Sequence, residues 1–392
     1  MGPVSRARRY NAAITACEKG GQFLRAMSLL DEMKSLNVSM PDLISYNAAI
    51  AACEADAHWR QALALLDEMQ DRGIVPDVIS CSAAISACEK AAQWRPALTV
   101  LNVMRDRGVE PNVISYSAAI SACGKAAQWK VALALLRDMR AEGLRPDVIT
   151  YNAAISACAK GLVPGEALRL LDEMQEQMLR PNGITYSAAI AACEAAGDRE
   201  TAKAVWAEAF ERRVLDARSR ATPGALDLHG FIAPVARVAC ACALDEWRAA
   251  WRAGKKRGRD ATGPDGDDDI VIVTGPGRGG AEAARGDGRL SDGPVLRPET
   301  IVQMLAKEPK LRVVDAPDMG RVVIPAASLR AWAEATRLRE SAAANALEGL
   351  TVAELRERCR EAKLAKYSRL RKAELVELLR KQGGGALGVP SR

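Results

Sequence analysis

Apolar residues recur with a helical spacing along more than half of the chain. In residues 113–147 one stripe holds Tyr116, Ile120 and Cys123, and a second holds Ala132, Leu135, Leu136 and Met139. A glycine turn and a proline follow the second stripe, and proline cannot continue a helix. The pattern predicts two amphipathic helices joined by a turn and closed by a short loop.

This unit repeats with a period of 35 residues, in the frames 43–77, 78–112, 113–147 and 148–182. An earlier copy, 7–42, has one extra residue before its Pro-Asp pair, and a degraded copy occupies 183–217. A fixed period in this range is typical of solenoids, because each unit buries its apolar face only against its neighbours. We therefore predict an α-class fold, a right-handed α-solenoid of about six helix–turn–helix repeats with a concave face.

Several residue types recur in frame within the repeats. A Tyr-Asn or Tyr-Ser pair opens the first helix, Ala-Leu lies in the second, and Gly-x-x-Pro-Asp or Pro-Asn ends the unit. The chain from 7 to 217 resembles the pentatricopeptide repeat family in all of these features. A tetratricopeptide array has a period of 34 residues and lacks the Pro-Asp or Pro-Asn ending.

This resemblance implies that each repeat reads one base of single-stranded RNA through two side chains. The two are the residue after the tyrosine position and the last residue of the unit. The pairs are Asn11 with Asp42, Asn47 with Asp77, Ser82 with Asn112, Ser117 with Asp147, and Asn152 with Asn182. The family's code assigns them U, U, A, G and a pyrimidine, read 5′ to 3′ along the chain.

A sixth pair would begin with Ser187, but its partner position holds Ala217, so its base stays unassigned. By the same resemblance, isoleucines that recur near the start of the first helix would sandwich each base; they are Ile44, Ile79, Ile114, Ile149 and Ile184. The alternative is that Asn and Ser merely cap the first helix, a role that suits both residues.

Charge is unevenly placed along the chain. The repeats hold 23 Lys and Arg against 26 Asp and Glu, whereas the remaining residues hold 32 against 23. A solenoid of this charge would rely on base contacts, with the basic remainder attracting phosphates. No apolar run approaches the roughly 18–20 residues that span a bilayer, so we expect no membrane partner. Six cysteines share one repeat position, which favours reduced packing residues over disulfides.

The segment 224–340 follows a different pattern, which predicts a small α/β domain. A short strand at 225–230 precedes a helix from Ala233 to Arg252, and a second strand covers 269–274. A helix near 298–307, two short strands at 311–314 and 321–324, and a helix from Ser328 complete the prediction.

Leu-Asp-Leu-His-Gly at 226–230, followed about 45 residues later by Thr-Gly-x-Gly, resembles the small MutS-related (Smr) domain. That family is associated with nucleic-acid nicking or RNA endonuclease activity. We expect Asp227 and His229 to be catalytic, because a carboxylate beside an imidazole can orient a general base or hold a water or Mg²⁺. Phosphate binding would fall to the glycine-rich loop, at Thr274, Gly275, Gly277 and Arg278. The alternative is a structural Asp–His pair in a domain that binds nucleic acid without cutting it.

The same loop matches a dinucleotide-binding fingerprint by letter, as Gly275-x-Gly277-x-x-Gly280. That fingerprint should open a long helix with an acidic residue about 20 residues further on. Here the sequence continues with further glycines that would break such a helix. We therefore expect no nicotinamide cofactor, no other cofactor is evident, and the identity of any metal is unknown.

Residues 345–382 predict two helices joined by a basic segment, with Thr351 and Glu354 forming a capping box at the first. The Tyr-Ser-x-Leu-Arg-Lys-Ala-Glu-Leu run at 367–375 resembles the N-terminal domain of transcription terminator Rho, a SAP-like module. The resemblance implies nucleic-acid binding, by RNA or DNA, through Lys363, Lys366, Arg369, Arg371 and Lys372. The alternative is a solvated charged hairpin or a protein-docking tail. Residues 383–392 are predicted to be a disordered tail.

Together these features predict a sequence-selective single-stranded RNA-binding protein that could also cleave RNA. The alternatives are a non-catalytic RNA-binding adaptor and a helical protein–protein scaffold. The resemblance implies work in a chloroplast or mitochondrion. The first repeat begins close to Met1 with no visible transit peptide, so we expect either a truncated N-terminus or action elsewhere.

Overall fold

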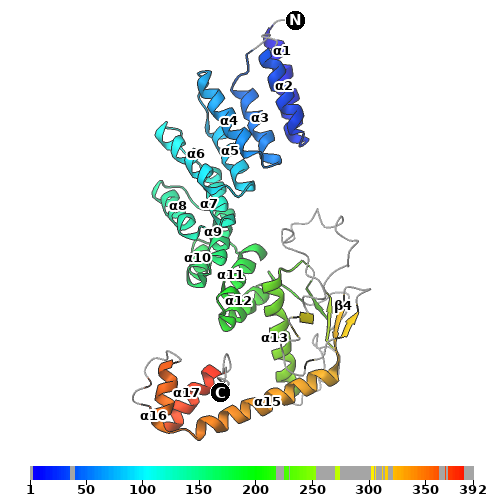
Figure 1. The fold of residues 1–392 in the computed structure, drawn as a ribbon, viewed down its shortest axis with the longest axis vertical. Coiled ribbons are helices and arrows are strands. Elements are labelled where there is room, and N and C mark those ends of the chain that lie inside the picture. Colours follow the sequence, from blue (N-terminus) through cyan, green and yellow to red (C-terminus); the bar gives the residue numbers. More distant parts are fainter. Residues whose placement is uncertain are drawn as a thin grey trace. The chain divides into compact units, whose positions relative to one another are not determined.

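The computed structural model describes residues 3–35, 40–217, 225–228, 230–252, 270–273, 302–303, 305, 311, 314–316, 321–361, 367 and 370–383. They fall into two compact units, Met1–Gly197 and Asp198–Arg392. Figure 1 shows paired helices along the first unit, and helices with a small sheet in the second. Within these residues, no helix combines the length and the apolar character needed to cross a membrane.

The first unit consists of paired helices. They are α1 (Pro3–Lys19), α2 (Phe23–Ser35), α3 (Leu43–Ala55), α4 (Trp59–Asp71), α5 (Val78–Lys90), α6 (Trp94–Asp106), α7 (Val113–Lys125), α8 (Trp129–Ala141), α9 (Val148–Lys160), α10 (Pro164–Glu176) and α11 (Gly183–Ala195). First helices of successive repeats pack side by side, and each second helix packs between its own first helix and the next one. This arrangement confirms the predicted α-solenoid of helix–turn–helix repeats.

Each first helix from α3 onward starts at an Asp or Asn that caps it. The Asp77 side chain, for example, accepts a hydrogen bond from the backbone N–H of Ser80 at 2.9 Å. The Ser80 hydroxyl accepts one in return from the backbone N–H of Asp77 at 3.2 Å, which completes a capping box. The last residue of one repeat is therefore also the first structural residue of the next.

The core of the array is formed by the two predicted apolar stripes. Tyr116, Ile120 and Cys123 are fully buried, as are Ala132 and Met139. The six cysteines at the shared repeat position are buried and form no disulfide, which confirms their prediction as reduced packing residues. Burial raises the pKa of the Cys53 thiol to about 12 and that of Cys123 to about 11, so both stay protonated near neutral pH.

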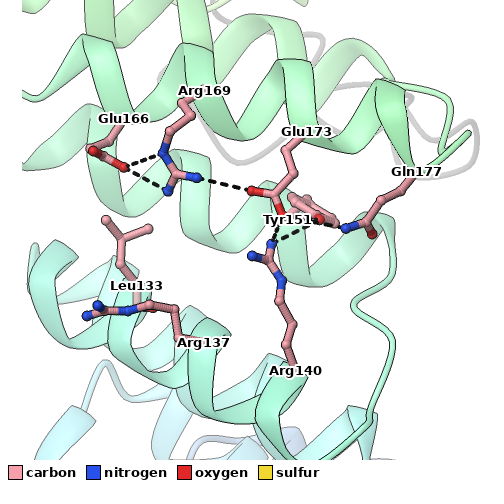
Figure 2. Close-up of polar contacts among 8 residues, drawn as sticks. All are labelled: Leu133, Arg137, Arg140, Tyr151, Glu166, Arg169, Glu173 and Gln177. Carbon is pink, nitrogen blue, oxygen red and sulfur yellow. Dashed lines mark hydrogen bonds and ion pairs between the residues drawn. The ribbon is translucent and has the colours of Figure 1, made fainter.

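A polar contact that the sequence reading missed joins neighbouring repeats. In Figure 2, the Tyr151 hydroxyl of α9 donates to Glu173 of α10 at 3.2 Å, and Arg140 of the preceding repeat contacts both. Tyr46, Glu68 and Lys34 form an equivalent set three repeats earlier. We call each such set a tyrosine–acid–cation link. It satisfies the hydroxyl of a tyrosine whose ring lies in the core.

In the second unit, α12 (Arg199–Glu211) packs against α13 (Ala233–Arg252), and Lys203 forms an ion pair with Asp245 at 2.8 Å. The described residues include one mixed sheet with the order β1-β2-β4-β3. Its strands are β1 (Leu226–Asp227), β2 (Ile270–Val273), β3 (Val314–Ala316) and β4 (Arg321–Ile324). β1 and β2 are parallel, whereas β4 is antiparallel to both β2 and β3. Only β3 departs clearly from its prediction, which ended at 314.

Helix α15 (Ala326–Glu348) begins two residues before its predicted start and continues past residue 340, where the α/β domain was predicted to end. Its Leu347 belongs to the core of the helical hairpin formed by α16 (Val352–Glu361) and α17 (Lys372–Gly383), together with Leu355, Cys359, Leu375, Val376 and Leu379. The predicted capping box is confirmed, because Glu354 accepts from the Thr351 backbone N–H at 2.7 Å and Thr351 accepts from that of Glu354 at 3.3 Å. The hairpin is therefore built onto the end of a continuous helix.

Candidate nucleic-acid interface

The two predicted base-reading residues of each complete pair lie next to each other, although about 30 positions separate them in sequence. Asn11 Nδ2 donates to Asp42 Oδ1 at 3.0 Å and to Oδ2 at 3.2 Å. Asn47 donates to Asp77 at 3.2 and 3.3 Å, and Asn152 donates to Asn182 Oδ1 at 3.3 Å. Each pair thus spans the seam between two repeats, with one member on the first helix and the other at the start of the next first helix.

A third side chain, which the sequence reading did not single out, contacts both members of every pair. It is the hydroxyl three residues after the capping Asp or Asn, in Ser45, Ser80, Ser115, Thr150 and Thr185; we call these the linking hydroxyls. Ser80 Oγ lies 2.5 Å from Asn47 Oδ1 and 2.8 Å from Asp77 Oδ1. Its spacing of three from Asp or Asn, repeated in frame, was the available signal in the sequence.

In the two repeats with serine at the first reading position, the linking hydroxyl provides the connection. Ser82 Oγ lies 2.7 Å from Ser115 Oγ, which lies 3.0 Å from Asn112 Oδ1. Ser117 Oγ lies 2.6 Å from Thr150 Oγ1, which lies 2.7 Å from Asp147 Oδ1. The shorter serine side chain therefore joins the same network through an intermediate hydroxyl.

The sixth position differs from the other five. Ser187 is buried, and its Oγ has no hydrogen-bond partner within the described residues. The position at which a capping Asp or Asn would lie holds Ala217, which carries no hydrogen-bonding side chain. The network of reading residues therefore stops at the fifth pair.

The alternative that Asn and Ser cap the first helix is wrong in its assignment of residues. Asn47, Ser82 and Ser117 lie inside their helices, at the fifth position after the capping residue. The cap is the other member of a reading pair, the Asp or Asn that ends the preceding unit. The same Asp or Asn therefore caps its own helix and lies next to the fifth-position residue of the preceding first helix.

Capping fixes which atom of the Asp or Asn faces away from the helix. Backbone N–H groups need an acceptor, so Oδ1 of Asn112 and Asn182 turns toward the helix terminus. The Nδ2 group of each is then left to donate elsewhere, whereas a capping Asp keeps a second oxygen that can only accept. Burial would raise the pKa of Asp42, but hydrogen bonds from Ser45 and Asn11 outweigh it and hold that pKa below its usual value.

Exposed isoleucines lie beside these pairs, at the second position of each first helix from α3 to α11. Their exposed fractions range from 46% at Ile184 to 67% at Ile149. They are the residues that the family resemblance assigns to sandwiching the bases, and that role stays a prediction.

Lysines end the first helices α5, α7 and α9, a regularity that the sequence reading overlooked. Lys90 pairs with Glu54 at 3.2 Å and Lys125 with Glu89 at 2.8 Å. Lys160 has no acid at the equivalent place, which holds Gly124, and it donates instead to the Lys125 carbonyl at 3.4 Å. Burial and the charge of Lys125 lower the pKa of Lys160.

The predicted catalytic and phosphate-binding residues are only partly described. Asp227 lies on β1, half-buried and in register with Val273 at the end of the parallel strand β2. His229, Thr274, Gly275, Gly277 and Arg278 lie outside the described residues. Among the residues that the structure does describe, no three His, Cys, Asp or Glu side chains gather as a metal site would require.

The predicted basic patch of the C-terminal module is likewise split. Arg371 and Lys372 are exposed at the start of α17. The Arg371 backbone N–H donates to Glu374 at 2.7 Å. Lys363, Lys366 and Arg369 lie outside the described residues, as do residues 384–392 of the predicted tail.

Models of known protein families match the repeat array and the C-terminal hairpin. Pentatricopeptide repeat domain models match 64–126 and 169–214, a PPR repeat family model matches 111–160, and a PPR repeat model matches 10–38, 44–74 and 149–178. A model of the Rho termination factor N-terminal domain matches 346–383. No curated protein matches the sequence.

Solved structures of repeat proteins are similar to parts of the chain. The pentatricopeptide repeat protein PPR10 from maize is 27% identical over 66% of this chain and 36% of its own, with a TM-score of 0.49. The repeat domain of protein-only RNase P 1 from Arabidopsis thaliana, in complex with tRNA, is 16% identical over 44% of this chain and 90% of its own, with a TM-score of 0.39. The chain thus spans about a third of the maize protein's length. With repeat models matching 10–38 and 44–214, just over half of its residues, the chain belongs to the pentatricopeptide repeat family and carries a Rho N-terminal domain near its end.

Proposed function

We propose that the repeat array binds single-stranded RNA and selects its sequence one base per repeat. The observation that carries the proposal is the recurrence of one arrangement at five successive seams. Each seam has a fifth-position Asn or Ser, a capping Asp or Asn, and an exposed isoleucine two residues after the capping residue. Family membership supports RNA as the partner, since such repeats read one base each with two or three side chains.

The side-chain atom of the Asp or Asn that is not used for capping gives the base selection a chemical basis. Uracil and guanine present a ring N–H on their pairing edge, whereas adenine and cytosine present an unprotonated ring nitrogen. A capping Asp offers an acceptor that suits the first two bases, and a capping Asn offers a donor that suits the other two. The capping residues then favour U or G at the first, second and fourth seams and A or C at the third and fifth, which is compatible with the code that the family resemblance assigns.

Phosphate contacts would come from few residues of the array. The cations of Lys90 and Lys125 are already paired with acids, whereas Lys160 has no acidic partner in the described residues. We assign Lys160 to a phosphate near the fourth and fifth bases. Base contacts would therefore supply most of the selectivity, and the basic C-terminal modules most of the salt-dependent affinity.

Base selection is tested by exchanging Asp77 for Asn, which keeps the cap but replaces an acceptor with a donor. Binding of end-labelled RNA carrying UUAGC would be compared with RNA in which the second base is C. We expect Asp77→Asn to shift preference at that base from U toward C by roughly tenfold or more. Asp67→Asn, on the exposed face of α4, is the matched control and should change nothing.

The outcomes of this experiment distinguish base reading from non-selective binding and from a protein–protein scaffold. A shift confined to the second base supports reading in this frame. Equal binding of UUAGC and scrambled RNA by the unaltered protein would exclude base reading. Loss of selectivity together with intact folding in the variant would also argue against a protein–protein scaffold, the remaining alternative.

A second candidate function, RNA cleavage by the Smr-like segment, is favoured by the sheet. β1 and β2 are parallel, and Asp227 is in register with Val273, so these two strands end side by side. In sequence, His229 follows β1 and the glycine-rich loop follows β2. The test is incubation of UUAGC RNA with and without Mg²⁺, with His229→Ala beside it. Product that disappears in the variant supports cleavage, and binding without product leaves a non-catalytic adaptor.

Members of this family generally work in organelles, so chloroplasts or mitochondria are the compartments we propose.

A further inference from the structure

The linking hydroxyls do more than the caps require. All five are fully buried, and each lies at a seam between a fifth-position residue and a capping residue. The cap itself uses a backbone group, since the Ser80 N–H donates to Asp77 Oδ1 at 2.9 Å. An alanine at this position would keep that bond and lose only the reciprocal one, in which the Ser80 hydroxyl accepts from the backbone N–H of Asp77 at 3.2 Å. The capping box therefore uses the hydroxyl only as an acceptor and leaves its proton for another partner.

A hydroxyl has one proton to donate, and its destination differs between two kinds of repeat. Where the fifth residue is Asn, the Asn Oδ1 faces the linking hydroxyl at 2.5 to 2.6 Å. This oxygen can only accept, so the linking hydroxyl must donate to it. The Asn Nδ2 is then turned toward the capping side chain, at 3.0 Å in the case of Asn11 and Asp42.

Where the fifth residue is Ser, the direction can reverse. Ser82 and Ser117 each carry a proton of their own and lie 2.6 to 2.7 Å from the linking oxygen. The linking hydroxyl is free to donate to the capping Oδ1, at 3.0 Å for Asn112 and 2.7 Å for Asp147. The fifth-position serine then donates inward, and only its lone pairs remain for a base.

From this geometry we propose that the linking hydroxyls are positioning residues for base selection, fixing the orientation of the fifth-position side chain at each seam. The inference rests on the proposed RNA reading, and it assigns a third residue to the selection of each base. Ser80 does not touch the base; it acts through Asn47 by holding the amide with Nδ2 toward Asp77. Replacing the hydroxyl would leave the carbonyl oxygen of the half-buried Asn47 without this donor, and the amide would lose its fixed orientation.

The test compares Ser80→Ala with Ser80→Thr, since threonine occurs naturally at the equivalent positions 150 and 185. Affinities would be measured for four RNAs that differ only at the second base, and for RNAs that differ at the fourth. We expect Ser80→Ala to reduce the preference for U at the second base by roughly three- to tenfold. Selectivity at the fourth base should be unchanged, and Ser80→Thr should keep both preferences.

Thr185 supplies a second pair of variants that controls for folding. Thr185→Val removes the hydroxyl with little change in shape, whereas Thr185→Ser keeps the hydroxyl and removes a methyl group. Only the valine variant should lose selectivity at the fifth base, and thermal unfolding would confirm that both variants are folded.

Four outcomes would overturn the inference. If Ser80→Ala lost affinity equally for every RNA, the hydroxyl would have a purely structural role. The same would follow if Ser80→Ala and Ser80→Thr had identical base preferences. A selective unaltered protein whose preference survives both Ser80→Ala and Thr185→Val would overturn this inference alone. An unaltered protein with no preference at the second or fifth base would overturn the proposed reading as well.

Discussion

Repeats 43–77 and 78–112 share a scaffold but differ in how they are joined to their neighbours. Their helices begin and end at equivalent residues, and their core positions match, as with Leu66 and Leu101. The first has the tyrosine–acid–cation link of Tyr46, Glu68 and Lys34, whereas the second has Cys81, Val103 and Gln70 in those places. All three partners have changed together.

This difference shows that the link is a unit. A tyrosine hydroxyl or a lysine left without its acid at a half-buried site would cost about 1–3 kcal/mol, so the partners are kept or lost as a set. The fifth-position residues vary independently of the link. Repeats 78–112 and 113–147 both have Ser at the fifth position, but only 113–147 has a tyrosine at the link position. The scaffold therefore supports two independent sets of choices, one for joining repeats and one for the bound partner.

The largest expected effect tests what the two repeats share. Leu66→Ala and Leu101→Ala each leave a cavity in the core, and each should lower the free energy of unfolding by about 3–4 kcal/mol. Urea unfolding followed by circular dichroism would measure both. A much smaller effect in one repeat would mean that the two cores are not equivalent, against their near-identical burial.

A substitution that removes only the acid of the link should have a smaller effect. Glu68→Val, which imitates Val103, leaves Lys34 and the Tyr46 hydroxyl without their acceptor, and we expect a loss of about 1–3 kcal/mol in unfolding free energy. Adding Lys34→Gln and Tyr46→Cys would complete the imitation and should recover part of that loss. Strict additivity of the three changes in urea unfolding would contradict a coupled link.

The acid in the link also predicts a pH dependence. Burial would raise the pKa of Glu68, but its hydrogen bond and ion pair with Lys34 and the Tyr46 hydroxyl outweigh this and hold the pKa below the usual 4.5. A lowered pKa in the folded state means that the stabilisation is present above about pH 4.5 and is lost as the pH falls through the folded value. The difference in thermal midpoint between the unaltered protein and Glu68→Val should therefore shrink as the pH falls below 4.5. A constant difference down to pH 3 would exclude an ionised Glu68 as the source.

The sequence predicted the repeat frame because the frame depends on local period. It also suggested the reading pairs, from residue types at fixed spacing, and their reading of bases stays a prediction. It did not predict the linking hydroxyls, since Ser80 reads as an ordinary capping-box residue until Asn47 is placed against it from the preceding repeat. The link was missed for a related reason: Tyr46 and Glu68 are 22 positions apart and meet only after two helices have packed. Likewise, α15 continues past residue 340, where the α/β domain was predicted to end, and its Leu347 packs into the hairpin core, a tertiary contact with no local signal.

The smallest expected effect concerns the turn between the two helices of each repeat. Ala57 and Ala92 occupy this turn with φ of 58° and 55°, a left-handed conformation that disfavours side chains, whereas Gly197 occupies the equivalent place with φ of 81°. Glycine would relieve about 1 kcal/mol of strain at Ala92 but would also increase the entropy of the unfolded chain. We expect Ala92→Gly to raise the unfolding free energy by about 0.5 kcal/mol, and Ala57→Gly to do the same. The reverse change, Gly197→Ala, should lower it by about 1 kcal/mol. Equal stabilisation by Ala57→Gly and Ala92→Gly would show that the turn contributes equally in both repeats, whether or not the repeat has a tyrosine–acid–cation link. A loss at Ala92 alone would instead mean that the repeat without a tyrosine–acid–cation link depends on a stiffer turn.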